Sequence, residues 1–303
     1  MFLRTIILAV AFLTFVGTAP AQTELSDVAT WTVDINQNYS TIPNVTYSVA
    51  NNYECKLDAY VRKGADAPVP TVVSIHGGGW VAGKKETAIL WLLPYFEMGF
   101  SVVNVEYRLA EVSLAPAAVE DCRLALIWVF KNAEKYGFDT SRIVVTGGSA
   151  GGHLSLMTGM LTPEAGFDSP RNWQRRLVPP PRVSAIVNWY GITDVADLLS
   201  GPNTQEYAVS WLGSQSDRME LAKRVSPLTY IRKDLPPILT IHGTKDKLVP
   251  YEHAVQLHKG LDEKGVANKL ITIPEGGHGG FSRDQIRDIQ KQIRAFLKEH
   301  GII

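Results

Sequence analysis

The chain has 303 residues, of which 45% are hydrophobic, and its 30 basic and 30 acidic side chains give a formal net charge of zero. This length and hydrophobic content allow one substantial buried core and do not require a second domain. Charges of both signs are dispersed without long runs, which argues against nucleic acid or an acidic membrane surface as a partner.

The first 21 residues have the pattern of an export signal. Arg4 gives a positive start, residues 6–16 form an apolar run, and Ala19-Pro20-Ala21 is a small-x-small cleavage site. The run is too short to cross a membrane, which takes about 18 or more apolar residues. We therefore expect a secreted or periplasmic protein with no membrane span after signal removal, and a single domain over residues 22–303.

The rest of the chain alternates between short apolar strands and helices, after a polar stretch at 22–44 that we expect to be an irregular arm. Strands are predicted at residues 45–50, 55–62, 71–75, 101–107, 143–146, 183–189, 238–242 and 269–273. Helices are predicted at residues 86–98, 116–136, 154–161, 250–265 and after residue 282. This alternation predicts an α/β fold with an eight-stranded, mostly parallel sheet, helices on both faces and an antiparallel first pair of strands.

Two long connections between predicted elements contain no predicted strand, so their structure does not follow from the sequence. Residues 160–182 contain several prolines and arginines, and residues 194–236 show short helical patterns only. Long insertions of this kind often form part of a binding site. We expect the second of them to contribute a pocket wall or a small lid.

The sequence Gly147-Gly148-Ser149-Ala150-Gly151 stands between a predicted strand and a predicted helix. A G-x-S-x-G motif in this setting holds the serine in a strained turn, with its hydroxyl above the sheet. The helix that follows directs free N–H groups and a positive dipole end at the same place. Ser149 is therefore the candidate nucleophile, and an ordinary glycine-rich loop is the alternative.

A serine nucleophile needs a base, and seven histidines compete for this role. His278 follows the last strand and has two glycines on each side, so its loop could swing the imidazole over the sheet edge. His76 and His242 are at strand ends and remain possible. The other four are interpreted as surface or packing residues: His153, His253, His258 and His300.

The acid that orients the base is predicted to be Asp246, which follows the penultimate strand. The order Ser149, Asp246, His278 is then the Ser–Asp–His order of a hydrolase triad. Asp194 also follows a strand, but it comes one strand too early and is better interpreted as a helix N-cap.

Backbone N–H groups could stabilise a developing oxyanion. Ala150 supplies one donor, and Gly78 and Gly79 supply others, because glycine backbone can approach a substrate closely. His76 and Gly77 are expected to brace this loop. Trp80 is either part of the pocket or a core residue.

Two cysteines, Cys55 and Cys122, occur on the apolar faces of a predicted strand and a predicted helix. An exported protein could join them in a disulfide, and buried free thiols explain both positions equally well. Neither cysteine lies in a metal-binding pattern, and we expect no metal.

Three motifs together resemble the α/β-hydrolase serine esterases, in particular the hormone-sensitive-lipase-like and the bacterial feruloyl and acetyl-xylan esterases. They are His76-Gly77-Gly78-Gly79-Trp80, the serine motif with Gly152, and Gly277-His278-Gly279-Gly280-Phe281. The resemblance covers roughly residues 45–297. It implies a cofactor-free enzyme in which Ser149, Asp246 and His278 match the triad, and Gly78, Gly79 and Ala150 match the oxyanion donors.

The chain departs from the lipase-like members in two ways. It has Glu111-Val112 where they often have proline and glutamate after Y-R-L-A, and residues 22–44 are too short for their helical cap. Both departures favour an open site over a deep lipid pocket.

These patterns predict an exported serine carboxylesterase for short-acyl or hydroxycinnamoyl esters, on a small molecule or on plant cell-wall polysaccharide. The alternative is an exported prolyl-type peptidase, since such enzymes also have Gly243-Thr244-Lys245-Asp246 followed by Val249-Pro250. A non-catalytic binding module on the same scaffold is the third hypothesis.

Overall fold

The computed structural model describes residues 25–168 and 180–303, so the predicted signal at 1–21 lies outside the described residues. The chain divides into a first unit that ends at Gln37 and a second unit that spans Asn38–Ile303. No helix within the described ranges has both the length and the apolar character needed to cross a membrane.

Helix α1 (Asp27–Asn38) replaces the irregular arm that was expected at 22–44. The hydroxyl of Ser26 accepts a hydrogen bond from the N–H of Ala29 at 3.2 Å, so a serine begins the helix. Neither glycine nor proline occurs between Gln22 and Pro43 to interrupt it. The prediction was wrong because this stretch is polar, and polarity alone does not prevent a helix.

Eight strands form one sheet within the described part of the chain, in the order β1-β2-β4-β3-β5-β6-β7-β8. Strand β2 is antiparallel to both β1 and β4, and the other neighbours are parallel, which confirms the predicted mostly parallel sheet. The strands are β1 (Tyr39–Ala50), β2 (Tyr53–Arg62), β3 (Val69–Ile75), β4 (Ser101–Val105), β5 (Phe138–Gly148), β6 (Ala185–Trp189), β7 (Ile238–Gly243) and β8 (Asn268–Ile273).

Strand β1 begins at Tyr39 and not at residue 45. The prediction missed its first half because the strand has an irregularity in the middle, which interrupts the sequence pattern of a strand. Its pairing with β2 shifts register between Ile42 and Val45, and Asn44 there has a φ of 55°. Proline does not continue a strand ladder and marks such bulges. Pro43 falls within the arm expected at 22–44, whereas it is part of a bulge in β1.

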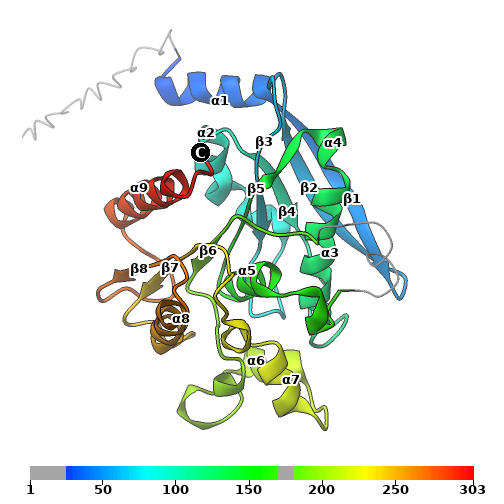
Figure 1. Ribbon diagram of the computed structural model, residues 1–303, viewed down its shortest axis with the longest axis vertical. Helices are drawn as coiled ribbons and strands as arrows, with labels where there is room; N and C mark the ends of the chain where they lie inside the picture. The colour runs from blue at the N-terminus through cyan, green and yellow to red at the C-terminus, as the bar shows by residue number, and fades with distance from the viewer. Residues whose placement is uncertain (1–24, 169–179) are drawn as a thin grey trace, which may run out of the picture. The chain divides into compact units, whose positions relative to one another are not determined.

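Helices cover both faces of the sheet (Figure 1). Helices α3 (Ala117–Lys131), α5 (Ala150–Met160) and α8 (Glu252–Glu263) pack on the face that presents Val73 and Val145. Helices α2 (Leu93–Glu97) and α9 (Arg283–Glu299) contact β4 and β7 on the opposite face. Because strand side chains alternate between faces, Ser74 and Thr146 point toward this second layer.

Several predicted helices differ in their limits. The helix expected at 86–98 is a 3₁₀ helix, η1 (Lys85–Leu92), followed by α2, since Pro94 lacks the N–H that a continuous helix needs. The helix expected at 116–136 ends at Lys131, and α4 (Ala133–Tyr136) follows as a separate turn. Helix α5 begins at Ala150, directly after the serine, and not at residue 154. Ser282 and Gln285 form a capping box at the start of α9.

The insertion at 194–236 contains short helices and no strand, as predicted. They are η3 (Ala196–Leu198), η4 (Gly201–Asn203), α6 (Glu206–Leu212), α7 (Arg218–Arg224) and η5 (Pro227–Tyr230). In the connection at 160–182, η2 (Pro163–Ala165) is followed by residues outside the described ranges.

Candidate active site

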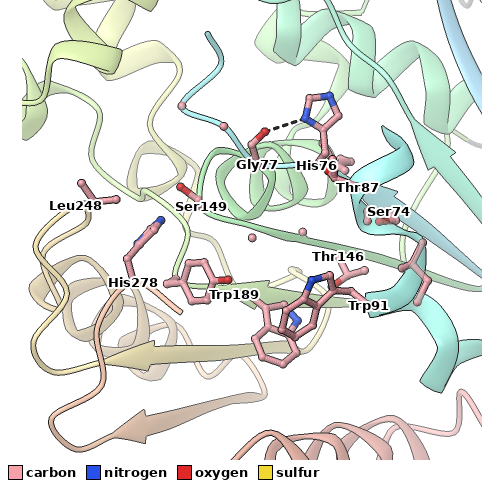
Figure 2. Close-up of a pocket in the computed structure, with 18 of the residues that line it drawn as sticks. Ser74, His76, Gly77, Thr87, Trp91, Thr146, Ser149, Trp189, Leu248 and His278 are labelled. Atoms are coloured by element: carbon pink, nitrogen blue, oxygen red, sulfur yellow. Dashed lines mark hydrogen bonds between the residues drawn. The ribbon is translucent and has the colours of Figure 1, made fainter. Parts of the chain in front are cut away.

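Ser149 occupies the sharp turn between β5 and α5. Its backbone has φ 58° and ψ −123°, a combination that is strained for any residue with a Cβ atom. A Cβ atom at Gly147 or at Gly151 would collide with the carbonyl oxygen of Ile75, so both neighbours must be glycine. The turn therefore presents the serine side chain to the cavity above the sheet (Figure 2).

His278 and Asp246 meet at the same edge of the sheet. Nδ1 of His278 lies 2.7 Å from Oδ2 of Asp246, and the carboxylate is fully buried. The other carboxylate oxygen, Oδ1, accepts the N–H groups of Leu248 and Val249 at 2.8 and 2.9 Å. The aspartate is thus fixed at both oxygens and can hold the imidazole in one orientation.

A second histidine, His242, contacts the same carboxylate. Its Nε2 atom lies 3.2 Å from Oδ2 of Asp246 and 3.0 Å from the carbonyl oxygen of Val249. Both neighbours accept hydrogen bonds, so Nε2 carries the hydrogen. The sequence placed His242 at a strand end but gave no sign that it would lie beside the acid.

The environment of Asp246 favours its ionised form. Burial alone would raise the pKa of this carboxyl, but hydrogen bonds from His242, His278 and the Val249 N–H outweigh it and hold the pKa well below its usual range. The group is therefore an anion throughout neutral conditions. It can stabilise a positive charge that develops on His278.

Ser149 and His278 both line a cavity of about 610 Å³ (Figure 2). The cavity is also lined by the Gly77-Gly78-Gly79 loop, by Trp91 from η1 and by Trp189 at the end of β6. The insertion at 194–236 contributes Tyr207, whose hydroxyl donates to Leu248 O at 2.7 Å, so this segment forms a wall as predicted. The nucleophile candidate and the base candidate thus share one space that a substrate can enter.

The predicted oxyanion donors lie beside the serine. Gly78 and Gly79 line the cavity, and neither N–H group has an acceptor among the described residues. Ala150 is the first residue of α5, where N–H groups have no partner within the helix. Together these groups could receive a negatively charged oxygen.

His76 lies behind the glycine loop. Its Nδ1 atom is 2.8 Å from Gly77 O, and its ring stacks on Tyr107 with centroids 4.3 Å apart. Burial lowers the pKa of His76, so the ring is neutral and Nδ1 donates to the carbonyl. This geometry fits the bracing role that the sequence suggested for His76 and Gly77.

Trp80 is a core residue and not a pocket wall. It is fully buried, stacks on Trp211 with centroids 4.1 Å apart and donates from Nε1 to Nδ1 of His153 at 3.1 Å. It is absent from the cavity lining that the described residues form. The large apolar ring is better accommodated in the core, where its N–H finds a partner.

The remaining candidates have structural roles. His153, His253 and His258 are buried packing residues, and His300 caps the end of α9. The carboxylate of Asp194 accepts the N–H groups of Ala196 and Asp197 at 3.0 and 3.3 Å. It therefore binds the first turn of η3 from the position before the N-cap residue, Val195, and is not itself the N-cap.

Cys55 and Cys122 are free, buried thiols, so the disulfide alternative is wrong. Burial raises the pKa of Cys55 to about 12 and that of Cys122 well above its usual range, which leaves both thiols protonated. Across the described ranges, no cluster of three or more histidine, cysteine or acidic side chains could hold a metal ion.

Comparison with known proteins finds esterases among the relatives and the structural neighbours of this chain. The chain is 29% identical over 223 residues to esterase LipQ of Mycobacterium tuberculosis, covering 70% of this chain and 50% of that protein. A truncated carbohydrate esterase from gut microbiota superposes with a TM-score of 0.71 at 30% identity, covering 86% of this chain and 97% of that one. Esterase 2 of Thermogutta terrifontis shares the fold at 24% identity, with a TM-score of 0.71 and coverage of 88% and 96%.

This chain spans about half the length of the curated relatives that it matches. The family match covers residues 57–261 and so includes the serine turn and Asp246. The resemblance to α/β-hydrolase esterases that three sequence motifs suggested is confirmed, and the chain belongs to the BD-FAE family.

Proposed function

We propose that this protein is an exported serine carboxylesterase that hydrolyses short-acyl or hydroxycinnamoyl esters through an acyl-enzyme. The observation that carries the proposal is the hydrogen bond of 2.7 Å between His278 and the buried Asp246, beside a cavity that His278 shares with Ser149. We assign Ser149, His278 and Asp246 the roles of nucleophile, base and orienting acid.

The geometry supports the following reaction. Oγ of Ser149 attacks the ester carbonyl carbon while its proton passes to Nε2 of His278, and Asp246 stabilises the imidazolium through Nδ1–H. The carbonyl oxygen becomes an anion that accepts N–H groups of Gly78, Gly79 and Ala150. The imidazolium then protonates the alcohol oxygen, the bond to the alcohol breaks and the acyl group remains on Ser149. Water, activated by His278, releases the acid and restores the serine.

Ester chemistry is favoured over peptide cleavage by the relatives, several of which are named esterases. One structural neighbour is a carbohydrate esterase, and another is a bifunctional protein of Bacteroides eggerthii that combines a GH43 unit with a carbohydrate esterase unit. On this basis we propose that the ester is carried by a polysaccharide, with plant cell-wall material as the natural source of acetyl and hydroxycinnamoyl groups.

The test is hydrolysis of p-nitrophenyl acetate by the wild type and by Ser149→Ala. Loss of the nucleophile should reduce kcat by about 10³-fold or more. Equal rates for the two proteins would rule out Ser149 as the nucleophile. A dipeptidyl-proline amide assayed in parallel distinguishes esterase from peptidase, and labelling of Ser149 by a fluorophosphonate probe would exclude a non-catalytic binding module.

Export is tested separately. Expression of the full chain in a bacterium should place the protein outside the cytoplasm, with a mature N-terminus at Gln22. Mass spectrometry of the purified protein measures this N-terminus, and retention of residues 1–21 would contradict the export signal.

A further inference from the structure

Helix α6 of the insertion at 194–236 is held firmly beside the glycine loop. The ring of Trp211, near the end of this helix, stacks on Trp80, which follows Gly79 directly. The carbonyl oxygen of Trp211 accepts the N–H of Ala115 at 3.0 Å, and both tryptophan rings are fully buried. A close-packed aromatic pair of this kind leaves the helix little freedom to move. Helix α6 can therefore support other segments that it contacts.

Tyr207 of α6 packs on one of the proposed oxyanion donors. A Cβ atom added at Gly79 would lie 2.8 Å from Cβ and 2.9 Å from Cγ of Tyr207, so the backbone of Gly79 lies directly against this side chain. The rings of Tyr207 and Trp80 have centroids 5.8 Å apart. The glycine loop and its tryptophan thus fix the base of the Tyr207 side chain.

The other end of Tyr207 reaches the turn that carries the orienting acid. Its hydroxyl donates to Leu248 O at 2.7 Å, and the N–H of Leu248 donates to Oδ1 of Asp246 at 2.8 Å. Burial raises the pKa of Tyr207, and the negative charge of Asp246 raises it further, so the phenol keeps its hydrogen and donates it. A single residue, Leu248, therefore connects the Tyr207 hydroxyl to the carboxylate.

A second hydrogen bond joins the same two segments. Nε2 of Gln205, the residue before α6, donates to Lys247 O at 3.2 Å. Lys247 and Leu248 are exposed, and among the described residues their carbonyl oxygens accept no hydrogen bond except those from Gln205 and Tyr207. An exposed turn with few contacts opens easily. The constraint on this turn therefore comes largely from the insertion.

We propose that Tyr207 is a positioning residue that holds the Asp246 turn at a fixed place relative to the glycine loop. This inference rests on the proposed function, because it requires Asp246 to orient His278 and Gly79 to receive an oxyanion. The Tyr207 hydroxyl is engaged with Leu248, so it acts through Asp246 and not on the substrate. The insertion then arranges the active site in addition to forming a wall of the cavity.

The first variant, Tyr207→Phe, removes the hydroxyl and keeps the ring against Gly79. It should lower kcat for p-nitrophenyl acetate by about three- to tenfold, because a less constrained Asp246 spends less time in the position that orients His278. KM should change little, since the lost hydrogen bond is to the protein and not to the substrate.

Tyr230→Phe is the matched control. Tyr230 is a half-buried tyrosine of the same insertion, and its hydroxyl also donates to a carbonyl oxygen at 2.7 Å, that of Arg224. It is absent from the cavity lining that the described residues form. This variant loses an equivalent hydrogen bond away from the site and should keep the wild-type kcat and KM.

A mutant cycle with Asp246 separates positioning from a general effect on the fold. In Asp246→Ala there is no carboxylate to hold, so Tyr207→Phe should have no further effect on kcat. Asp246→Ala itself should lose about 10³-fold or more, and the rate of Ser149→Ala is therefore subtracted from every measurement. Asp246→Asn keeps the size of the side chain without fixing the imidazole tautomer, and it serves as the background if Asp246→Ala does not fold.

Three results would overturn the positioning role: an unchanged kcat in Tyr207→Phe, a decrease matched by Tyr230→Phe, or an equal decrease with and without the Asp246 carboxylate. A higher KM at unchanged kcat would assign Tyr207 to substrate binding and overturn it as well. Each of these results leaves the esterase proposal intact if the wild type hydrolyses p-nitrophenyl acetate and Ser149→Ala does not. A wild type that cleaves no ester would contradict the proposed function, and the positioning role with it.

Discussion

The Nε2 atom of His242 lies 3.2 Å from Oδ2 of Asp246, the same oxygen that lies 2.7 Å from Nδ1 of His278. One carboxylate oxygen therefore contacts two imidazole rings. The ring of His242 is fully buried and is absent from the cavity lining that the described residues form, whereas that of His278 faces the cavity. In the proposed mechanism, this difference favours His278 as the base and His242 as a positioning residue.

Substitution of the two histidines should have very different effects on p-nitrophenyl acetate hydrolysis. His278→Gln removes the base and should lower kcat by about 10³-fold or more. His242→Gln leaves Asp246 with His278 and two backbone N–H donors, so we expect a decrease in kcat of about tenfold with KM little changed. Steady-state kinetics of the two variants, with circular dichroism to verify folding, makes the comparison.

A larger effect of the His242 substitution would contradict the roles proposed for the two histidines. If His242→Gln lost as much activity as His278→Gln while remaining folded, His242 would have to take part in proton transfer. A large increase in KM with unchanged kcat would instead indicate a role in substrate binding, which the buried position of His242 contradicts.

His76 should affect the oxyanion donors through the backbone of the glycine loop. Its Nδ1 atom holds Gly77 O at 2.8 Å, next to the N–H groups that are proposed to receive the oxyanion. His76→Phe keeps a ring to stack on Tyr107 but loses the hydrogen bond. Because complete loss of an oxyanion donor costs about 10²–10³ in rate, a displaced loop should lower kcat roughly tenfold and change KM little.

Partial rescue distinguishes positioning from general destabilisation. His76→Asn retains an N–H donor close to the place of Nδ1 and should recover part of the lost kcat, although it fills less space. Equal kcat values for His76→Asn and His76→Phe would show that the hydrogen bond to Gly77 does not matter for the reaction.

The serine turn should tolerate no Cβ atom at Gly147. There the added atom would meet the carbonyl oxygen of Ile75 and lie 2.6 Å from the carbonyl carbon of Gly151, both of which are backbone atoms that cannot move aside. Gly147→Ala should therefore lower the thermal unfolding temperature or prevent folding. Gly277→Ala is the matched control, since a Cβ atom there has no neighbour within 4 Å. Differential scanning fluorimetry measures both, and equal Tm values would contradict the steric argument.

Much of this architecture could be predicted because the sequence pattern is local. Each parallel strand is an apolar run between turn residues, and Ser149, Asp246 and His278 each lie in the turn or loop that follows such a run. Since parallel strands end at a common edge, their order along the chain was enough to predict that the three residues meet. The mostly parallel sheet could be predicted from the same local pattern, and the strand order of the structure confirms it.

Some contacts could not be predicted, because they join residues from two different elements. The sequence of neither element shows how the two pack against each other. Tyr95 was part of a predicted helix, and only the packing of α2 on the sheet places it in the lining of the same cavity as Ser74 and Thr146. Likewise, Trp80 follows the glycine loop directly, yet it turns away from the cavity and stacks on Trp211. Periodicity identifies a buried face but not the partner that the face meets.

His153 makes the stability of the protein depend on pH. It is fully buried in α5, and its Nδ1 atom accepts the Trp80 N–H at 3.1 Å while Nε2 lies 2.6 Å from Val225 O. Burial lowers the pKa of His153 to about 4, and the hydrogen bond to Val225 O only partly opposes this. The folded protein therefore keeps this ring neutral at a pH where the unfolded chain protonates it.

The direction of the effect follows from proton binding. Between the unfolded pKa of about 6.5 and the folded pKa of about 4, the unfolded chain binds the extra proton and the folded protein does not, so acidification favours unfolding. The stability due to neutral His153 is complete above pH ~6.5 and declines by about 1.4 kcal/mol per pH unit below it. Glutamine does not titrate, so the free energy of unfolding of His153→Gln lacks this pH dependence. The difference in unfolding free energy between the wild type and His153→Gln should therefore shrink as the pH falls.

Urea unfolding of the wild type, His153→Gln and Tyr136→Phe at pH 8, 6 and 5 measures this difference. The gap in unfolding free energy between the wild type and His153→Gln should narrow by about 2 kcal/mol between pH 8 and pH 5. The gap to Tyr136→Phe should stay constant, because a phenol does not titrate in this range. A gap to His153→Gln that also stays constant would mean that His153 is protonated equally in the folded and unfolded chains, contrary to its buried, donor-facing position.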